Sequence, residues 1–247
     1  MTIVVIGIAM FVGVPTARDV TSATVGASAV GELSGAAGGG DYGFLARDRV
    51  GSPMRYDPCH SVRFVINPTG APPGAVIEVR EAFRRLGEVT GITFGDAGLT
   101  DESHIRIGAG TRPSYQPTRY GAGHWAPILV SWAAARDEPI LAGNVLGYGG
   151  STSYWTSSSD EAYVTGEIVL DRDESIVRPG FGQGLTRGNL ELHELGHVAG
   201  LDHVHSQAEI MNPSVTDRSP DGYGPGDLAG LTQLGAAAGC LRTATPA

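Results

Sequence analysis

The chain has 247 residues, of which 41 % are hydrophobic and 17 % are charged, and its formal net charge is -9. This composition is compatible with a buried core in one large domain or two small ones, and it argues against a wholly disordered chain. The acidic balance argues against nucleic acid as a partner, because Lys and Arg provide no surplus of positive charge to neutralise phosphates.

The chain opens with an apolar run from Ile3 to Val14, followed by small residues at 15–17. This run is too short for an ordinary membrane-spanning helix, which needs about 20 residues, and it fits the apolar region of a signal peptide. The positively charged start of a signal peptide is missing, so a weak membrane anchor and a buried strand remain alternatives. We expect residues 1–17 to be a signal peptide or a short N-terminal anchor, and the protein to be secreted or extracellular.

Residues 18–41 consist mainly of Gly, Ala, Ser, Thr and Val, with few large side chains. Such a segment buries too little surface to offset the chain entropy lost on ordering. We therefore expect a linker or a short pro-segment here, followed by a folded domain over residues 42–247.

The apolar pattern of this domain predicts helices and strands in a mixed order. Helical spacing of apolar residues predicts a helix over 75–91, and later helices are expected over 185–200 and 224–239. Alternation and short apolar runs predict strands over 61–67, 92–94, 104–109, 128–133, 147–153 and 163–171. A helix among early strands, with two helices late, predicts an α+β domain with about three helices on one twisted, mixed sheet.

The stretch HELGHVAGLDH, residues 193–203, holds three of the chain's seven histidines. His193 and His197 are four residues apart, so on a helix both imidazoles share one face and reach a common point. Glu194 can deprotonate a water at that point without being a ligand. Gly200 can end the helix in a left-handed conformation, and His203 then returns toward the same point. Three neutral nitrogens and one open position predict a catalytic zinc site, and the alternative is three ordinary histidines on an amphipathic helix.

This stretch resembles the H-E-x-x-H-x-x-G-x-x-H signature of the metzincin metalloproteases. The segment EIMNPSV, residues 209–215, is similar to the Met-turn of that family, in the form found in its matrixin branch. The resemblance implies that Met211 is an apolar floor beneath the metal. It also implies that Pro213, Ser214 and Val215 line one wall of the pocket for the substrate side chain just after the cut. Matrixins usually carry Tyr where Val215 stands.

The resemblance further implies that residues 42–247 are a zinc metalloprotease catalytic domain that adopts the metzincin fold. Segment 147–153 would lie near the edge strand that pairs with an extended substrate by strand addition. We expect one catalytic Zn²⁺, a protein or peptide substrate and a monomer, while calcium is left open. The alternatives are a zinc-dependent hydrolase of a non-peptide bond and a catalytically silent, zinc-holding binding module.

The chain departs from the matrixin pattern at its cysteines and at its other histidines. The P-R-C-G-type cysteine of a matrixin pro-segment is missing from the sequence. Because the two cysteines of an exported chain form an even pair, we expect a disulfide between Cys59 and Cys240, with two unrelated thiols as the alternative. His104 and His124 lack the companions of a second zinc site, and we expect both to be ordinary histidines.

Overall fold

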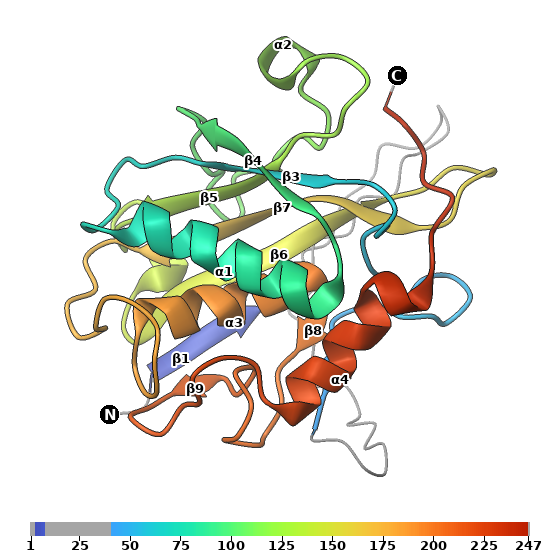
Figure 1. Ribbon diagram of the computed structural model, residues 1–247. Coiled ribbons are helices and arrows are strands. Elements are labelled where there is room, and N and C mark those ends of the chain that lie inside the picture. Colours follow the sequence, from blue (N-terminus) through green and yellow to red (C-terminus); the bar gives the residue numbers. More distant parts are fainter. Residues whose placement is uncertain (1–2, 8–40, 247) are drawn as a thin grey trace.

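The computed structural model describes residues 3–7 and 41–246, and its centre is a twisted, seven-stranded mixed sheet (Figure 1). The strands follow the order β4-β3-β5-β7-β6-β1-β9 across this sheet. Their bounds are β1 Ile3–Gly7, β3 Val62–Ile66, β4 Phe94–Leu99, β5 Ile128–Ala133, β6 Val145–Tyr154, β7 Ala162–Asp171 and β9 Ser214–Val215. Strands β4, β3, β5 and β7 pair in parallel, whereas β6 runs antiparallel to β7. A second, two-stranded sheet pairs β2 Gly43–Phe44 with β8 Leu201–Asp202.

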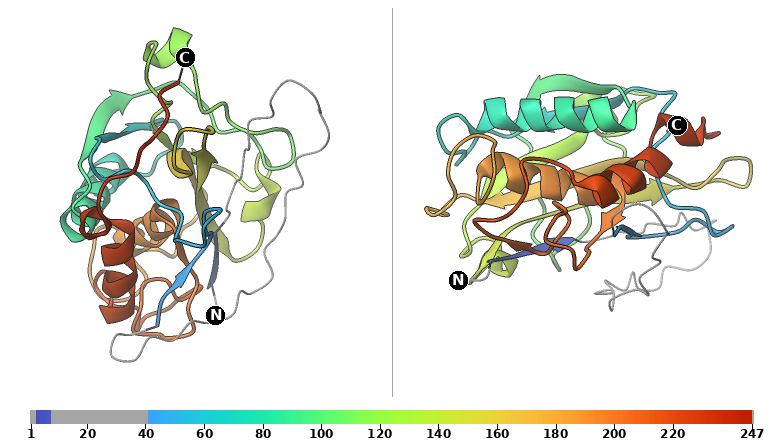
Figure 2. Two further views of the ribbon diagram at one scale, coloured as in Figure 1. Left: turned by 90° about the vertical axis from the view of Figure 1, so that its right-hand side faces the viewer. Right: turned by 60° about the horizontal axis from the view of Figure 1, so that its bottom comes forward.

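Helices α1 Ala75–Thr90 and α3 Arg187–Ala199 cover one face of the large sheet, and a third helix, α4 Pro225–Leu234, packs beside them against β8. Helices α1 and α3 lie side by side, and α4 contacts both (Figures 1 and 2). A short helix, α2 Pro117–Tyr120, and the 3-10 turns Pro139–Leu141 and Ala236–Ala238 complete the described elements. The α+β class and the mixed sheet with about three main helices agree with the sequence-based prediction.

Helix α1 shows how the apolar pattern produces this packing. Its buried side chains include Val79, Phe83 and Leu86, which follow helical spacing and face the core. The ring of Phe83 stacks on Phe64 of β3 with 3.9 Å between ring centroids. The helix ends at Gly91, whose φ of 69° is left-handed, as the sequence predicts.

Two predicted strands differ from the structure. Residues 104–109 form no strand, because this segment crosses the other face of the sheet as a loop, where the amide of Ile107 donates to Glu138 Oε2. Gly108, with φ of 84°, turns the chain away there. The strand expected over 92–94 begins at Phe94 and continues to Leu99.

The N-terminal strand β1 lies between β6 and β9, in parallel with β6 and antiparallel to β9. This is the strand alternative of the sequence-based interpretation for residues 3–7. The remainder of the predicted signal peptide and nearly all of the predicted linker lie outside the described residues, so the proposed division of the N-terminus stays a prediction. Within the described parts of the chain, no helix is long and apolar enough to cross a membrane.

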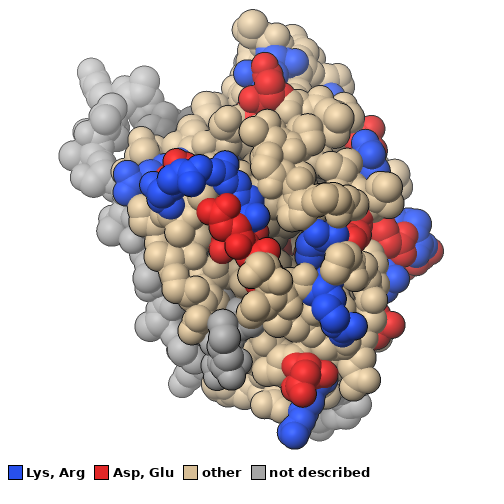
Figure 3. All heavy atoms as spheres, turned by 90° about the vertical axis from the view of Figure 1, so that its left-hand side faces the viewer, with Lys and Arg blue, Asp and Glu red and all other residues tan. Residues whose placement is uncertain are grey.

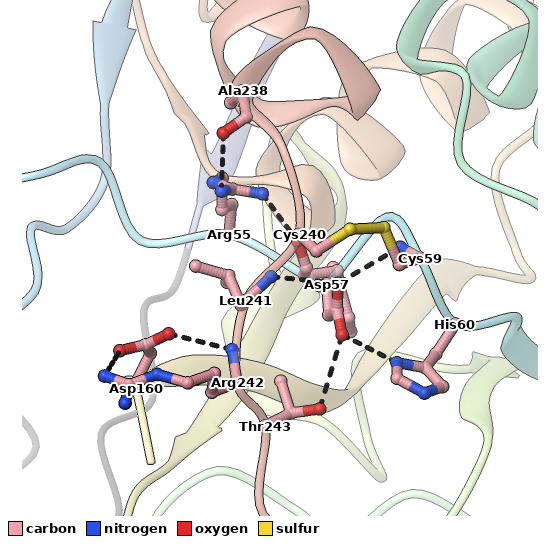
Figure 4. Close-up of a disulfide and its surroundings, with 11 residues drawn as sticks. Arg55, Asp57, Cys59, His60, Asp160, Ala238, Cys240, Leu241, Arg242 and Thr243 are labelled. Atoms are coloured by element: carbon pink, nitrogen blue, oxygen red, sulfur yellow. Dashed lines mark hydrogen bonds and ion pairs between the residues drawn. A yellow bond between two sulfur atoms is a disulfide. The ribbon is translucent and has the colours of Figure 1, made fainter.

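Cys59 and Cys240 form a disulfide that links the segment before β3 to the C-terminal tail (Figure 4). The side chain of Asp57 strengthens this link, because its Oδ1 accepts hydrogen bonds from the amides of Cys59 and Leu241. The disulfide spans a sequence separation of 181 residues. In the chain-entropy model a loop of this length corresponds to roughly 5 kcal/mol of stabilisation.

Candidate metal centre

Helix α3 presents His193 and His197 on one face, and neither histidine is exposed to solvent. The helix begins after Thr186, whose hydroxyl accepts a hydrogen bond from the amide of Asn189 and so acts as an N-cap. It ends at Gly200, where φ is 120° and an added Cβ would lie 2.8 Å from the carbonyl oxygen of Met54. Glycine is therefore required at this turn, which brings His203 back toward the helix.

The three histidines converge on one point. Their Nε2 atoms lie 3.0 Å (His193–His197), 3.1 Å (His193–His203) and 3.1 Å (His197–His203) apart. Three nitrogens bound tetrahedrally to zinc at about 2.0–2.1 Å stand about 3.3 Å from one another. The cluster is therefore compatible with a single zinc ion held by the three Nε2 atoms.

Hydrogen bonds to backbone carbonyls fix the two helical imidazoles. His193 Nδ1 lies 2.7 Å from the oxygen of Ile210, and His197 Nδ1 lies 2.9 Å from the oxygen of Leu201. A carbonyl only accepts, so each Nδ1 donates its proton and each Nε2 keeps a free lone pair. Burial lowers the pKa of His193 to about 3, and it also lowers the pKa of His197 and His203. All three are therefore neutral near pH 7, which is the form that binds a metal.

Glu194 lies beside this cluster and is fully buried. Neither of its carboxyl oxygens has a hydrogen-bond partner among the described residues, and burial raises its pKa well above the ordinary value. Two glycines of β6 leave room for the side chain: a Cβ on Gly149 would lie 3.1 Å from Oε2, and one on Gly147 would lie 3.2 Å from Oε1. The sequence suggested only an edge strand for this segment, and the requirement for glycine was visible only once α3 was packed against it.

Met211 packs beneath α3, and its side chain is 1 % exposed. A Cβ added to Gly196, between the two helical histidines, would lie 2.3 Å from the sulfur of Met211. The helix and the methionine therefore meet in direct contact at the level of the cluster.

Two acidic residues, Glu209 and Asp227, hold this turn in place; the sequence predicted Asp227 only as the N-cap of the last helix, whereas the N-cap is Gly224 and Asp227 is the third helical residue. Asp227 of α4 accepts hydrogen bonds from the amides of Ile210 and Gly224, and Glu209 accepts from the amides of Gly226 and Asp227. The turn that carries Met211 is thereby joined to the first turn of α4. Burial raises the pKa of Asp227 to about 7. The carboxylate of Asp227, at the third helical position, accepts from the amide of the N-cap Gly224, which is one half of a capping box.

The expected pocket wall lies on the far side of β1. Ser214 and Val215 form β9 and pair with Ile3 and Val4 of β1, and Pro213 directly precedes them. The groove between the β6 edge and β9 is one strand wide, and in this structure β1 fills it. It is therefore wide enough for one extended chain.

The remaining histidines stay outside the cluster. His104 Nε2 lies 3.7 Å from Glu138, and His124 is exposed. Neither joins a group of three potential metal ligands among the residues that the structure describes.

The mixed sheet, the helix with two histidines, the third histidine after a glycine turn and the methionine below define a metzincin-like site. Residues 149–234 match the family model described as matrixin. The chain is therefore matrixin-like in the region that carries the histidine cluster.

Matrix metalloproteinases from several animals are similar to this chain over short segments. Matrix metallopeptidase-21 of Danio rerio is 40 % identical over 53 residues, which is 22 % of this chain and 9 % of the relative. Matrix metalloproteinase-21 of Cynops pyrrhogaster is 34 % identical over 77 residues, or 28 % of this chain and 12 % of the relative. Matrix metalloproteinase-21 of Homo sapiens is 34 % identical over 59 residues, or 24 % and 10 %. The matched segment thus spans only 9 to 12 % of these relatives.

Proposed function

We propose that the protein is a zinc-dependent endopeptidase that cleaves extended protein or peptide substrates. One observation carries the proposal: the Nε2 atoms of three neutral histidines meet within 3.1 Å of one another beside an unpaired, buried Glu194. The matrixin match over residues 149–234 supports the same activity.

In this proposal His193, His197 and His203 hold the zinc ion, with Met211 as the apolar floor. The ion, when bound, supplies Lewis acidity toward a carbonyl oxygen and a water molecule. Glu194 takes the proton of the attacking water and passes it to the leaving amine, so that its carboxylate is restored after each turnover. Burial raises the pKa of Glu194, which strengthens it as a proton acceptor.

We propose that the substrate lies as an extended strand along the outer edge of β6, with Pro213, Ser214 and Val215 on its other side. The position of β1 in this groove supports the assignment, because an extended segment fits between β6 and β9. A substrate strand and β1 exclude each other there. The active form therefore requires residues 3–7 to leave the groove, which removal of a signal peptide would achieve.

The test measures zinc content and peptide-library cleavage on the exported protein, with its N-terminus sequenced and with chelator added in a parallel sample. Chelator-sensitive cleavage together with one equivalent of zinc supports the proposal. Zinc without cleavage on the processed protein would instead favour a hydrolase of a non-peptide bond or a zinc-holding binding module.

A further inference from the structure

A cavity of about 310 Å³ lies at the end of the sheet where β3 and β5 begin, and neither Glu194 nor the three clustered histidines line it. Its volume falls at the lower end of the range of about 300–1,000 Å³ that small-molecule sites occupy. The proposed peptidase chemistry does not use this cavity. We call it the tail pocket, and its lining consists of residues 56–57, 60–63, 123–127, 163–164 and 243–246.

The C-terminal tail forms one wall of the tail pocket and is held in place at several points. The disulfide fixes Cys240, and the hydroxyl of Thr243 donates to Oδ2 of Asp57 (Figure 4). Further along the tail, the carbonyl oxygen of Ala244 accepts a hydrogen bond of 3.0 Å from Nε1 of Trp125. The pocket is therefore preformed, so that binding of a ligand requires little ordering of this wall.

The charged side chains of the tail pocket are mostly basic, although the chain as a whole has a net charge of -9. His60, Arg63 and His124 line it, and among the described residues of its lining only Asp57 is acidic. Both carboxyl oxygens of Asp57 are already occupied: Oδ1 accepts from two backbone amides, and Oδ2 accepts from His60 Nδ1 and Thr243. The charged groups therefore leave donors rather than acceptors for a ligand.

Arg63 provides most of these donors. It is partly buried on β3, and its Nη2 donates to the carbonyl oxygen of Trp125 at 3.1 Å; it has no acidic partner among the described residues. Arg187, at the start of α3, shows the contrast, because it donates to both carboxyl oxygens of Glu78 at 2.7 and 3.0 Å. Figure 3 shows the side of the molecule from which α1 and α3 begin, where acidic and basic side chains form small mixed clusters. The guanidinium of Arg63 is thus available to an anion, and a carboxylate matches its planar N–H donors.

The remainder of the lining favours an anion that carries an apolar body. The ring of Trp125 packs against Tyr154 with 4.7 Å between ring centroids, which fixes its position in the wall. The aromatic and apolar side chains of the lining include Tyr56, Val62, Trp125, Pro127, Tyr163 and Val164. A bare inorganic anion would leave this surface uncovered, whereas an aromatic ring would bury it. A cation would oppose the basic side chains.

We propose that the tail pocket binds a carboxylate that is carried on an aromatic body. The carboxylate accepts hydrogen bonds from the guanidinium of Arg63, and the ring lies against Trp125. His60 is a second contact, because its Nδ1 is held by Asp57 and its Nε2 is left for the ligand. Two sources share this chemistry: a free aromatic acid, and the C-terminal end of a peptide whose last residue is aromatic.

The experiment titrates the full-length protein with sodium phenylacetate and follows heat release and thermal unfolding. Phenylacetamide is the matched control ligand, because it has the same shape but no charge. N-acetylglycyl-phenylalanine, as the free acid and as the amide, forms a second pair. We expect saturable binding with a raised unfolding midpoint for an acid, at least about tenfold tighter than for its amide. Binding of phenylacetate alone supports a free acid as the source, and binding of the peptide acid supports a chain end.

A substitution on β3 locates the binding in the tail pocket. Arg63→Met should weaken the binding of the acid at least about tenfold. Arg136→Met is the matched control, because it removes the same charge from an exposed arginine that does not line the pocket, and it should leave the affinity unchanged. Each titration is repeated with chelator, since carboxylates also bind zinc.

Two results on the wild-type protein would overturn the proposal: equal binding of acid and amide in both pairs, or no saturable binding of either acid. These results do not depend on the folding of a variant. Unchanged affinity in Arg63→Met would overturn it as well. Binding that disappears with chelator would place the acid at the histidine cluster instead and would also contradict the proposal. The readout needs no peptide cleavage, so it is independent of the proposed peptidase activity.

Discussion

Glu191 and Glu194 are two buried carboxyl groups on one helix, three residues apart, in two different surroundings. Both lack hydrogen-bond partners among the described residues, and burial raises the pKa of both well above the ordinary value. Glu194 faces the glycines of β6 beside three converging imidazoles, whereas Glu191 faces the apolar side chains of α1, β5 and β7. Burial and a perturbed pKa therefore do not by themselves mark a catalytic residue; the neighbouring groups decide what the carboxyl group can do.

Replacing Glu194 and replacing Glu191 should differ most in their effect on turnover. Glu194→Ala should lower kcat by roughly 10²- to 10⁴-fold, because the proton acceptor of the proposed reaction is removed. Glu191→Gln is the matched control on the same helix, and its kcat should stay within a few-fold of wild type. Peptide hydrolysis assays with zinc content measured in parallel test this. Near-normal turnover in Glu194→Ala with full zinc content would contradict the assignment of the base.

The zinc affinity of the cluster should depend on His203, the least buried of the three histidines. His203→Ala should weaken zinc binding by at least about tenfold, since even the outer-shell partners of a metal site are worth that much. Competition with a chromogenic chelator measures the affinity. An unchanged zinc affinity would remove His203 from the ligand set.

The space around Glu194 can be altered without touching the carboxyl group. In Gly149→Ala the new Cβ would lie 2.7 Å from the backbone oxygen of Glu194 and 3.1 Å from its Oε2. We expect kcat to fall about 10- to 100-fold through displacement of the base, with zinc affinity unchanged. Loss of zinc in proportion to activity would show instead that the substitution disturbs the whole of α3.

A third buried carboxyl group extends the comparison to the other face of the sheet. Burial raises the pKa of Glu167 on β7 to about 7, while its value in the unfolded chain is the ordinary one near 4.5. The folded state therefore favours the protonated carboxyl group. The contribution of this preference to the free energy of unfolding is complete below pH 4.5 and is lost as the pH rises toward 7. The loss amounts to at most about 3 kcal/mol for this group.

Urea unfolding from pH 4.5 to 7 in wild type and Glu167→Gln measures this contribution. The wild type should lose more of its free energy of unfolding over this range than the variant does. Parallel pH profiles of the two proteins would mean that Glu167 titrates normally in the folded state.

The smallest expected effect concerns the stability contributed at Glu191. Glu191→Leu should raise the free energy of unfolding by about 1–2 kcal/mol, because a polar group without a partner among the described residues is replaced by an apolar one in apolar surroundings. Urea denaturation of both proteins measures the change. A less stable variant would show that the Glu191 carboxyl group already has a partner in the folded protein.

The sequence predicted those parts of the molecule that depend on local spacing. His193 and His197 could be assigned to one site because a helix fixes their relative positions, and the glycine that ends the helix allowed His203 to be placed with them. The helix ending at Gly91 and the strand over 128–133 followed from local periodicity in the same way.

Features that depend on contacts between distant segments were not predictable from spacing. Glu191 has the residue type of an exposed helix position, and only the packing of α3 against α1 and the sheet shows that it is buried. Segment 104–109 alternates like a strand but lies on the sheet as a loop, because Glu138, far along the chain, accepts the hydrogen bond of Ile107. The anchoring of the Met211 turn by Asp227 likewise joins two segments that the sequence does not relate.

We propose that the histidine cluster, with zinc bound, and Glu194 together hydrolyse peptide bonds. The most direct measurement is zinc content and peptide-library cleavage on the exported protein, for wild type and Glu194→Ala side by side. We expect one equivalent of zinc in both proteins and chelator-sensitive cleavage in the wild type alone. Equal cleavage by both proteins, or cleavage that persists after the zinc is removed, would contradict it.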